Sequence, residues 1–360
     1  MPARGAAPSI WLLLGDKLGD NAQVEVIARA LGLPVIRKTV LPKPEWVLGK
    51  PPFRPSLDHL DLERSDPLEP PWPDLVLTIG RRPAAAALWI REQSGGAARL
   101  AIVGRPKRWS DRFALIIAPP QFAVPEAPNV LRLELPLMRP DAAAVAAAGE
   151  RWRDRLAAMP RPLTAVLVGG ETKPYRFDAP VAGRLLEALA ALRQRDGGSL
   201  YLTTSRRTQP AVVEALEHGL PEGSRLFRWA PDAADNPYLA LLALADRFVV
   251  TGDSISMMVE VARLGRPLSV FPLPVRRDPA TRVQRGLASA LAPQGPLAGL
   301  GGALRRRGLL GFPRDLDRVR RSLERRGLAV PLGEPFAASA GEAGDELAEV
   351  VARVRGLLAP

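Results

Sequence analysis

The 360-residue sequence contains no cysteine and only two histidines, His59 and His218. Without cysteine, the protein has no disulfide bond, no thiolate nucleophile and no cysteine-ligated zinc or iron–sulfur site. Two histidines far apart in the chain also exclude a histidine-rich metal site, and we predict that both lie at the surface. The sequence therefore predicts neither a metal ion nor an organic cofactor.

Long apolar runs are also missing. The first run, Ile10–Leu14, has five residues, fewer than the apolar core of a secretion signal requires. No segment approaches the roughly 18 consecutive apolar residues of a membrane span. These absences predict a cytoplasmic protein, and a peripheral position at the inner face of the membrane is a further hypothesis.

Lysine is scarce, because only six of the 50 basic residues are lysines and the other 44 are arginines. This ratio is typical of a GC-rich genome, so the net charge of +12 does not by itself predict a nucleic-acid partner. A basic chain still favours anionic partners such as phosphates and acidic lipids. The stretch 304–327, with nine arginines and three acidic residues, predicts either contact with an anionic membrane or a solvated face.

Short β-rich runs alternate with longer amphipathic stretches, which predicts βα units and parallel sheets. We expect an α/β fold of two Rossmann-like lobes facing a cleft, formed by residues 1–158 and 159–336. The sequence MPRP at 159–162 is typical of a hinge, and residues 337–360 are expected to form a C-terminal helix that packs on the first lobe. The proline-rich stretch 41–73 predicts a long loop with one short helix. The chain beyond Arg285 is predicted to be loose.

Parallel sheets bind ligands at the carboxyl ends of their strands, and two such ends in the second lobe suit phosphate. The glycines after TAVLV bring a ligand close to the backbone, and the polar run after SLYL offers hydroxyl and guanidinium donors. A plain turn and a capped helix start are the respective alternatives. The residues predicted to bind phosphate here are Gly169, Gly170, Lys173, Thr204, Ser205, Arg206, Arg207 and Thr208.

Two further strand ends in this lobe favour a nucleotide. Trp229 suits base stacking, with core packing as the alternative, and Asn236 and Tyr238 open the next helix. The fourth end is the most specific, because a buried strand runs into hydroxyls and N–H groups at a helix start, with a carboxylate two turns on that suits a ribose. Its predicted binding residues are Asp253, Ser254, Ser256, Met257 and Glu260.

The first lobe offers a candidate base. Its first strand ends in Gly15-Asp16-Lys17, and either Asp16 or Asp20 is predicted to deprotonate an acceptor, with helix capping as the alternative for Asp20. A second strand end, Gly80-Arg81-Arg82, carries two arginines.

In order and spacing, these segments resemble the Elm-type family, which joins plant mitochondrial fission factors and bacterial candidate glycosyltransferases. The resemblance extends over roughly residues 10–275 and rests on GDKLGDNAQ (15–23), DLVLTIGRR (74–82), VLVGG (166–170), TTSRRT (203–208), NPY (236–238) and TGDSISMMVE (251–260). The sequence departs from the family pattern at Arg105, which follows Gly104 at a position where family members often have an acidic residue.

The resemblance implies a GT-B architecture, with the acceptor on the first lobe and the donor on the second. Residues 245–267 also resemble the donor segment of the peptidoglycan N-acetylglucosaminyltransferase, which implies that Ser254 and Ser256 meet the diphosphate and Glu260 the ribose. We therefore predict a metal-independent glycosyltransferase that uses a nucleotide sugar and an unidentified acceptor, with a lipid-linked acceptor as one hypothesis. A non-catalytic scaffold and a sugar-nucleotide epimerase, for which Asp253 and Glu171 are the candidate acid–base pair, remain the alternatives.

Overall fold

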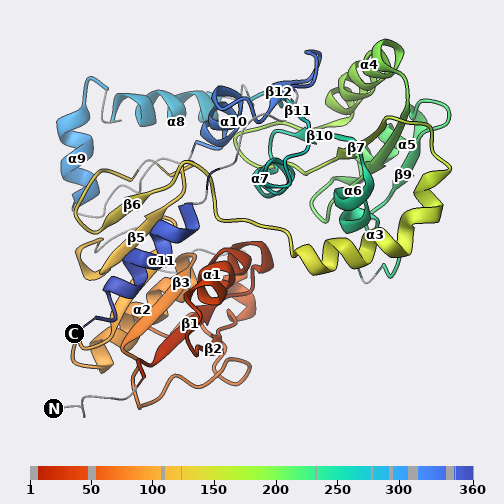
Figure 1. Cartoon of the computed structure of the whole chain (residues 1–360). Helices are drawn as coiled ribbons and strands as arrows, with labels where there is room; N and C mark the ends of the chain where they lie inside the picture. Colours follow the sequence, from red (N-terminus) through yellow and green to blue (C-terminus); the bar gives the residue numbers. More distant parts are fainter. Residues whose placement is uncertain are drawn as a thin grey trace. The chain divides into compact units, whose positions relative to one another are not determined.

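The computed structural model describes residues 7–47, 54–106, 110–122, 124–231, 233–276, 279–291, 295–306, 315–337, 344 and 346–359. It divides into two compact units (Figure 1). Unit 1 comprises Met1–Met138, Gly286–Asp315 and Asp345–Pro360, and unit 2 comprises Arg139–Arg285 and Leu316–Gly344. Each contains a six-stranded parallel sheet with helices, which confirms the predicted α/β class with two Rossmann-like units.

The sheet of unit 1 has the strand order β2-β1-β3-β4-β5-β6. The strands are β1 (Ile10–Leu14), β2 (Ile36–Thr39), β3 (Leu75–Ile79), β4 (Arg99–Val103), β5 (Leu115–Ala118) and β6 (Val130–Arg132). The helices are α1 (Leu18–Leu31), the 3-10 turns η1 (Pro44–Trp46) and η2 (Ser110–Arg112), α2 (Arg81–Gln93), α9 (Ala298–Arg306) and α11 (Glu346–Gly356). Strands β1 and β3 are buried along their whole length, which explains their continuous apolar sequence.

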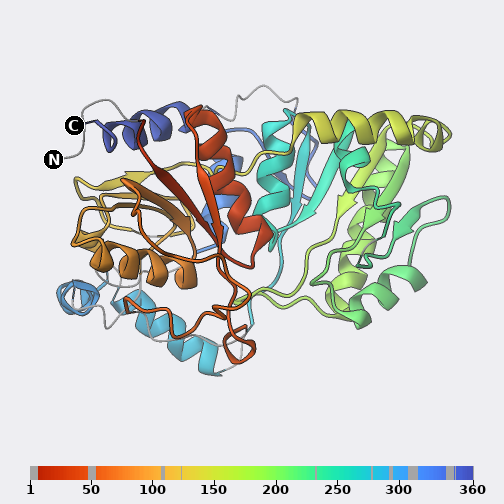
Figure 2. The same cartoon turned by 90° about the horizontal axis from the view of Figure 1, so that it is seen from below.

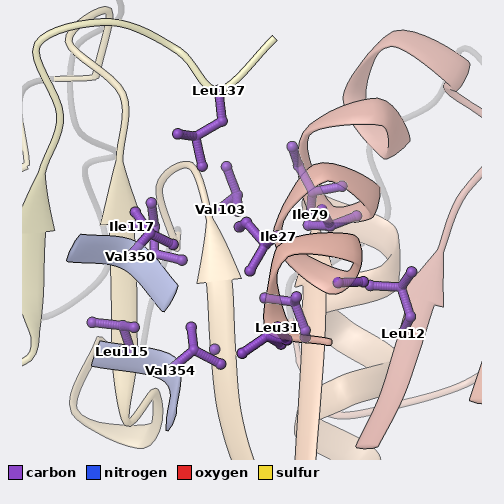
Figure 3. Close-up of a cluster of buried hydrophobic side chains, with 14 of the residues drawn as sticks. Leu12, Ile27, Leu31, Ile79, Val103, Leu115, Ile117, Leu137, Val350 and Val354 are labelled. Carbon is purple, nitrogen blue, oxygen red and sulfur yellow. The ribbon is translucent and has the colours of Figure 1, made fainter. Parts of the chain in front are cut away.

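The C-terminal helix α11 completes the core of unit 1. Its Val350, Val351 and Val354 are buried in the same apolar cluster as Ile27 and Leu31 of α1 (Figure 3). Figure 2 shows the two helices side by side, although more than 300 residues separate them in sequence. Helix α11, near the end of the sequence, therefore stabilises unit 1, which also contains the first strand of the chain.

Unit 2 has the strand order β12-β11-β10-β7-β8-β9. The strands are β7 (Leu163–Leu167), β8 (Ser199–Thr203), β9 (Arg225–Phe227), β10 (Arg247–Thr251), β11 (Leu268–Phe271) and β12 (Val330–Pro331). The helices are α3 (Ala142–Ala157), α4 (Ala179–Asp196), α5 (Pro210–His218), α6 (Tyr238–Leu244), α7 (Ile255–Arg263) and α10 (Asp317–Arg325).

The boundary between the units lies between Met138 and Arg139, twenty residues before the predicted one at 158–159. Helix α3 belongs to unit 2 because it packs on α6. Gly149 makes that approach close, since a Cβ at this position would lie 2.9 Å from the Cβ of Ala243. The predicted hinge at 159–162 consequently lies inside unit 2.

The prediction of loose chain beyond Arg285 is wrong for two segments. Helix α8 (Pro279–Ala290) crosses this position, and α9 follows it. Glycines such as Gly286 and Gly299 lie inside these helices, where they weaken the sequence signal for a helix. The C-terminal helix expected within 337–360 begins at Glu346, and 338–343 lie outside the described residues.

Strand order also locates the point in each sheet where the chain changes direction. In unit 2, β7, β8 and β9 lead one way and β10, β11 and β12 the other, so the switch lies between β7 and β10. In unit 1 it lies between β1 and β3. Ligands of open α/β sheets bind at such points, beyond the carboxyl ends of the strands.

Within the described ranges, no helix is both long and apolar enough to cross a bilayer.

Candidate functional site

At the switch point of unit 2, the loops after β7 and β10 are tied together by a buried network. The Gly169 N–H donates to Thr251 Oγ1 at 2.8 Å, and the Gly170 N–H donates to Asp253 Oδ2 at 2.8 Å. Thr251 Oγ1 in turn donates to Asp253 Oδ1 at 2.8 Å. Burial raises the pKa of Asp253 above its usual range, although these donors act in the opposite direction. Asp253 thus holds the two loops together.

The two glycines are needed for this packing. A Cβ on Gly169 would lie 2.3 Å from Asp253 Oδ2, and a Cβ on Gly170 would lie 2.1 Å from the backbone oxygen of Arg207. Gly169 and Gly170 are predicted to bind phosphate, but the N–H groups of both already donate to protein acceptors. At both glycines, the missing Cβ makes room for a neighbouring loop of the protein.

The loop after β8 is ordered by its own hydroxyls. Thr208 Oγ1 accepts from the Ser205 N–H at 2.8 Å and donates to Gly169 O at 2.6 Å. Thr204 Oγ1 accepts from the Trp229 N–H at 2.8 Å. These contacts connect β7, β8 and β9, so the predicted phosphate ligands Thr204 and Thr208 also have structural roles.

The cations at this edge differ in how they are held. Arg207 donates to Thr172 Oγ1 at 2.8 Å and lies 3.9 Å from the Asp253 carboxylate. Lys173 and Arg206 are exposed, and neither contacts an acidic group among the described residues. Both are therefore available to an anion.

Helix α7 starts at the same edge without a cap. Its N-cap residue, Ser254, is buried, yet its hydroxyl forms no hydrogen bond within the described part of the chain. The following N–H groups also lack a side-chain acceptor. Ser256 and Met257 lie on the less buried side of the helix. An uncapped helix start carries partial positive charge and attracts anions.

Glu260 lies on that same side of α7, one turn beyond Ser256. Tyr238 Oη donates to its Oε2 at 2.5 Å. Burial raises the pKa of Glu260, and the hydrogen bond from Tyr238 opposes that rise. The structure thus brings Tyr238, predicted as a loop or stacking residue, onto the carboxylate predicted to bind ribose.

The remaining predicted residues of unit 2 lie beside these loops. Trp229 is half-buried and absent from the buried core, so the core-packing alternative does not describe it. Asn236 is exposed, and its Oδ1 accepts from the Tyr238 N–H at 3.0 Å. It therefore fixes the start of α6.

At the switch point of unit 1, Asp16 is exposed and lies 3.3 Å from Arg82 at the start of α2. Asp20 is the third residue of α1, whose N-cap is Lys17, so Asp20 lies in the first turn of the helix and not at the N-cap position. Asn21 closes the turn by donating to Gly15 O at 2.8 Å.

His59 is the residue whose place sequence reasoning missed. It was predicted at the surface, but it is buried, and its Nε2 lies 3.1 Å from the backbone oxygen of Arg82. Burial lowers its pKa, so the ring is neutral, and the carbonyl partner assigns the proton to Nε2. A histidine within a proline-rich loop carries no periodicity that could have revealed this contact. His218, by contrast, is exposed as predicted.

The basic stretch 304–327 is divided between the two units, and residues 307–314 lie outside the described residues. In α10, Arg320 pairs with Asp317 and Glu324, and Arg321 pairs with Asp317. The charges of these two arginines are therefore compensated within their own helix.

Across the residues that the structure describes, no group of three acidic or histidine side chains could hold a metal ion.

The network around Asp253 predicts a stability difference between two matched substitutions. Thr251→Val removes the acceptor of the Gly169 N–H and a donor to Asp253, and should lower the free energy of unfolding by about 1–3 kcal/mol. Thr203→Val, at the buried end of β8, removes only a 3.4 Å contact and should cost about 0.5 kcal/mol or less. Urea denaturation measures both, and equal losses would contradict the central role of Thr251.

Two Rossmann-like units with polar carboxyl edges define the class of α/β proteins to which GT-B glycosyltransferases belong. The chain belongs to the mitochondrial fission ELM1 family, whose pattern matches residues 19–304. It is 26% identical over 220 residues to mitochondrial fission protein ELM1 of Arabidopsis thaliana, which covers 55% of this chain and 51% of that protein. It is 30% identical over 109 residues to the uncharacterized protein RP120 of Rickettsia prowazekii, covering 30% and 31%. The chain thus spans about half and about a third of these relatives.

Solved structures resemble the chain in fold. Spinosyn forosaminyltransferase SpnP has a TM-score of 0.48 at 16% identity and covers 98% of this chain and 100% of its own. The UDP-GlcNAc 2-epimerase of Methanocaldococcus jannaschii has a TM-score of 0.47 at 11% identity, covering 96% and 99%.

Proposed function

We propose that the protein is a glycosyltransferase that binds a nucleotide-diphosphate sugar on unit 2 and transfers the sugar to an acceptor hydroxyl. The observation that carries this proposal is the uncapped start of α7 at the switch point. There the hydroxyl of Ser254, a buried residue, has no hydrogen-bond partner among the described residues, and Glu260 follows on the same helix. A diphosphate supplies acceptors for the helix start, and a ribose supplies donors for the carboxylate.

The chemistry requires stabilisation of the departing diphosphate and a base for the acceptor. The N-terminus of α7, together with Arg206 on the loop after β8 and Lys173 on the loop after β7, provides positive charge for the leaving group. Asp16, exposed at the end of β1, is the proposed base. The acceptor is unidentified, and the basic stretch 304–327 is the reason for testing a lipid-linked compound.

The epimerase alternative is less favoured, because its two candidate acid–base residues are engaged. Asp253 is buried and accepts from Gly170 and Thr251. Glu171 is paired with Arg276 and accepts from Gln209. A scaffold that kept only the shape of the site would bind no nucleotide.

Two serines of unit 2 allow a direct test. Ser254→Ala removes a hydroxyl that has no partner among the described residues, so the free energy of unfolding should change by less than about 0.5 kcal/mol. Binding of a nucleoside diphosphate should nevertheless weaken about 10–100-fold, because a hydrogen bond to a charged phosphate is lost. Calorimetric titration with UDP, GDP and ADP, and with their sugar conjugates, measures this change.

Ser199→Ala is the matched control. The buried Ser199, at the opposite end of β8, donates to Pro160 O at 2.7 Å, so its loss should cost about 1 kcal/mol of stability and leave nucleotide binding unchanged. Failure of the unaltered protein to bind every nucleotide would overturn the proposed function. Equal binding by Ser254→Ala and the unaltered protein would exclude Ser254 from the site.

A further inference from the structure

We infer that Tyr238 is a positioning residue for ribose recognition: its phenol occupies Oε2 of Glu260, which leaves Oε1 to accept a hydrogen bond from a ribose hydroxyl. The inference rests on the proposed function, since it names how that same site selects ribonucleotides. Within the described chain, Tyr238 is the one group that donates to this carboxylate.

The backbone holds Tyr238 in place for this role. It is the first residue of α6, and the exposed Asn236 accepts from its N–H at 3.0 Å. Pro237, between them, is buried and ends the loop that leads into the helix. The phenol therefore reaches Glu260 of α7 from a fixed point, with an oxygen–oxygen distance of 2.5 Å. A short hydrogen bond to one oxygen restricts rotation of the carboxylate and so orients the other.

The pKa shifts of the two groups fix Tyr238 as the donor and Glu260 as the acceptor of this hydrogen bond. Burial, and then the neighbouring Glu260 carboxylate, raise the pKa of Tyr238 well above its usual value, so the phenol remains a donor at all working pH values. Burial also raises the pKa of Glu260, while the phenol lowers it and so favours the ionised form. An ionised carboxylate is an acceptor on both oxygens, whereas a protonated one is not.

No other charged group acts on Glu260 in the described part of unit 2. Helix α10, which packs against α7, pairs Arg320 with its own Asp317. On α7 itself, Arg263 donates to the backbone oxygen of Gly344. Loss of the Tyr238 hydroxyl should therefore shift the Glu260 pKa upward without compensation.

The experiment measures the dissociation constants of UDP, GDP and ADP and of their 2′-deoxy and 3′-deoxy counterparts between pH 4 and 8. In the unaltered protein, removal of at least one ribose hydroxyl should weaken binding about tenfold at pH 8. This preference should diminish as the pH falls and Glu260 is protonated. Tyr238→Phe should reduce the preference at neutral pH and move its midpoint to higher pH. Glu260→Gln should make the preference independent of pH.

Tyr201→Phe is the matched control. Tyr201 lies buried on β8 of the same unit, and its hydroxyl has no hydrogen bond among the described residues, so the same chemical change should leave the preference and its midpoint unaltered. A purely structural role for Tyr238 would weaken all nucleotides equally without moving the midpoint, and would overturn the inference. Nucleotide binding without any ribose preference would also overturn it while leaving the proposed function intact. Absence of all nucleotide binding would instead overturn the proposed function.

Discussion

Gly170→Ala is expected to lower the free energy of unfolding by about 3 kcal/mol and to disrupt the carboxyl edge of unit 2. The new Cβ would lie 2.1 Å from the Arg207 backbone oxygen and 2.3 Å from the Arg207 backbone carbon. Backbone atoms cannot move aside as a flexible side chain would. The loops after β7 and β8 must then separate, which also strains the bond from the Gly170 N–H to Asp253. Urea denaturation measures the loss.

Gly183→Ala provides the control for this substitution. Gly183 lies within α4 of the same unit, and apart from the adjacent residues and backbone of that helix no described atom lies within 4 Å of the position its Cβ would take. Alanine is favoured over glycine inside a helix, so this variant should be about 0.5–1 kcal/mol more stable than the unaltered protein. A Gly170→Ala variant of undiminished stability would contradict the tight contact between the two loops.

Periodicity and strand composition predict most of this fold, because both sheets are parallel and their strands read as short apolar runs. In helix α1 both signals are local: Val24, Ile27 and Leu31 repeat at helical spacing and are buried, and Gly32, which adopts φ 63°, ends the helix. The position of α3 could not be predicted in the same way. Its amphipathic sequence requires an apolar partner but does not specify which unit supplies it, and packing on α6 decides the outcome.

The sequence predicts which residues lie at the carboxyl edge of unit 2, because strand ends can be recognised locally. It does not predict how those residues pair. Gly169 and Gly170 suggest space for a ligand, whereas the space is filled by Asp253 and the Arg207 backbone. The contact between Tyr238 of α6 and Glu260 of α7 joins residues 22 positions apart and leaves no local signal in the sequence.

The largest expected effect on activity follows from Asp16→Asn. If Asp16 is the base that deprotonates the acceptor, its loss should reduce the rate of sugar transfer about 100–10,000-fold. Nucleotide binding should be unchanged, since the proposed donor residues belong to unit 2 and Asp16 to unit 1. The ion pair with Arg82, at 3.3 Å and partly exposed, contributes at most about 1 kcal/mol, so the variant should remain folded. The rate is measured as transfer of radiolabelled sugar into a lipid extract, with the nucleotide sugar that binds in the calorimetric titration as donor.

Asp20→Asn separates this role from the other carboxylate of the same segment. Asp20 lies in the first turn of α1, where its carboxylate interacts favourably with the positive end of the helix dipole. Its loss should lower the free energy of unfolding by less than about 1 kcal/mol and should change the rate of transfer little. A large loss of transfer in Asp20→Asn with activity retained in Asp16→Asn would assign the base to Asp20. Full activity in both variants would exclude a carboxylate base at the end of β1 and would assign deprotonation of the acceptor to another group.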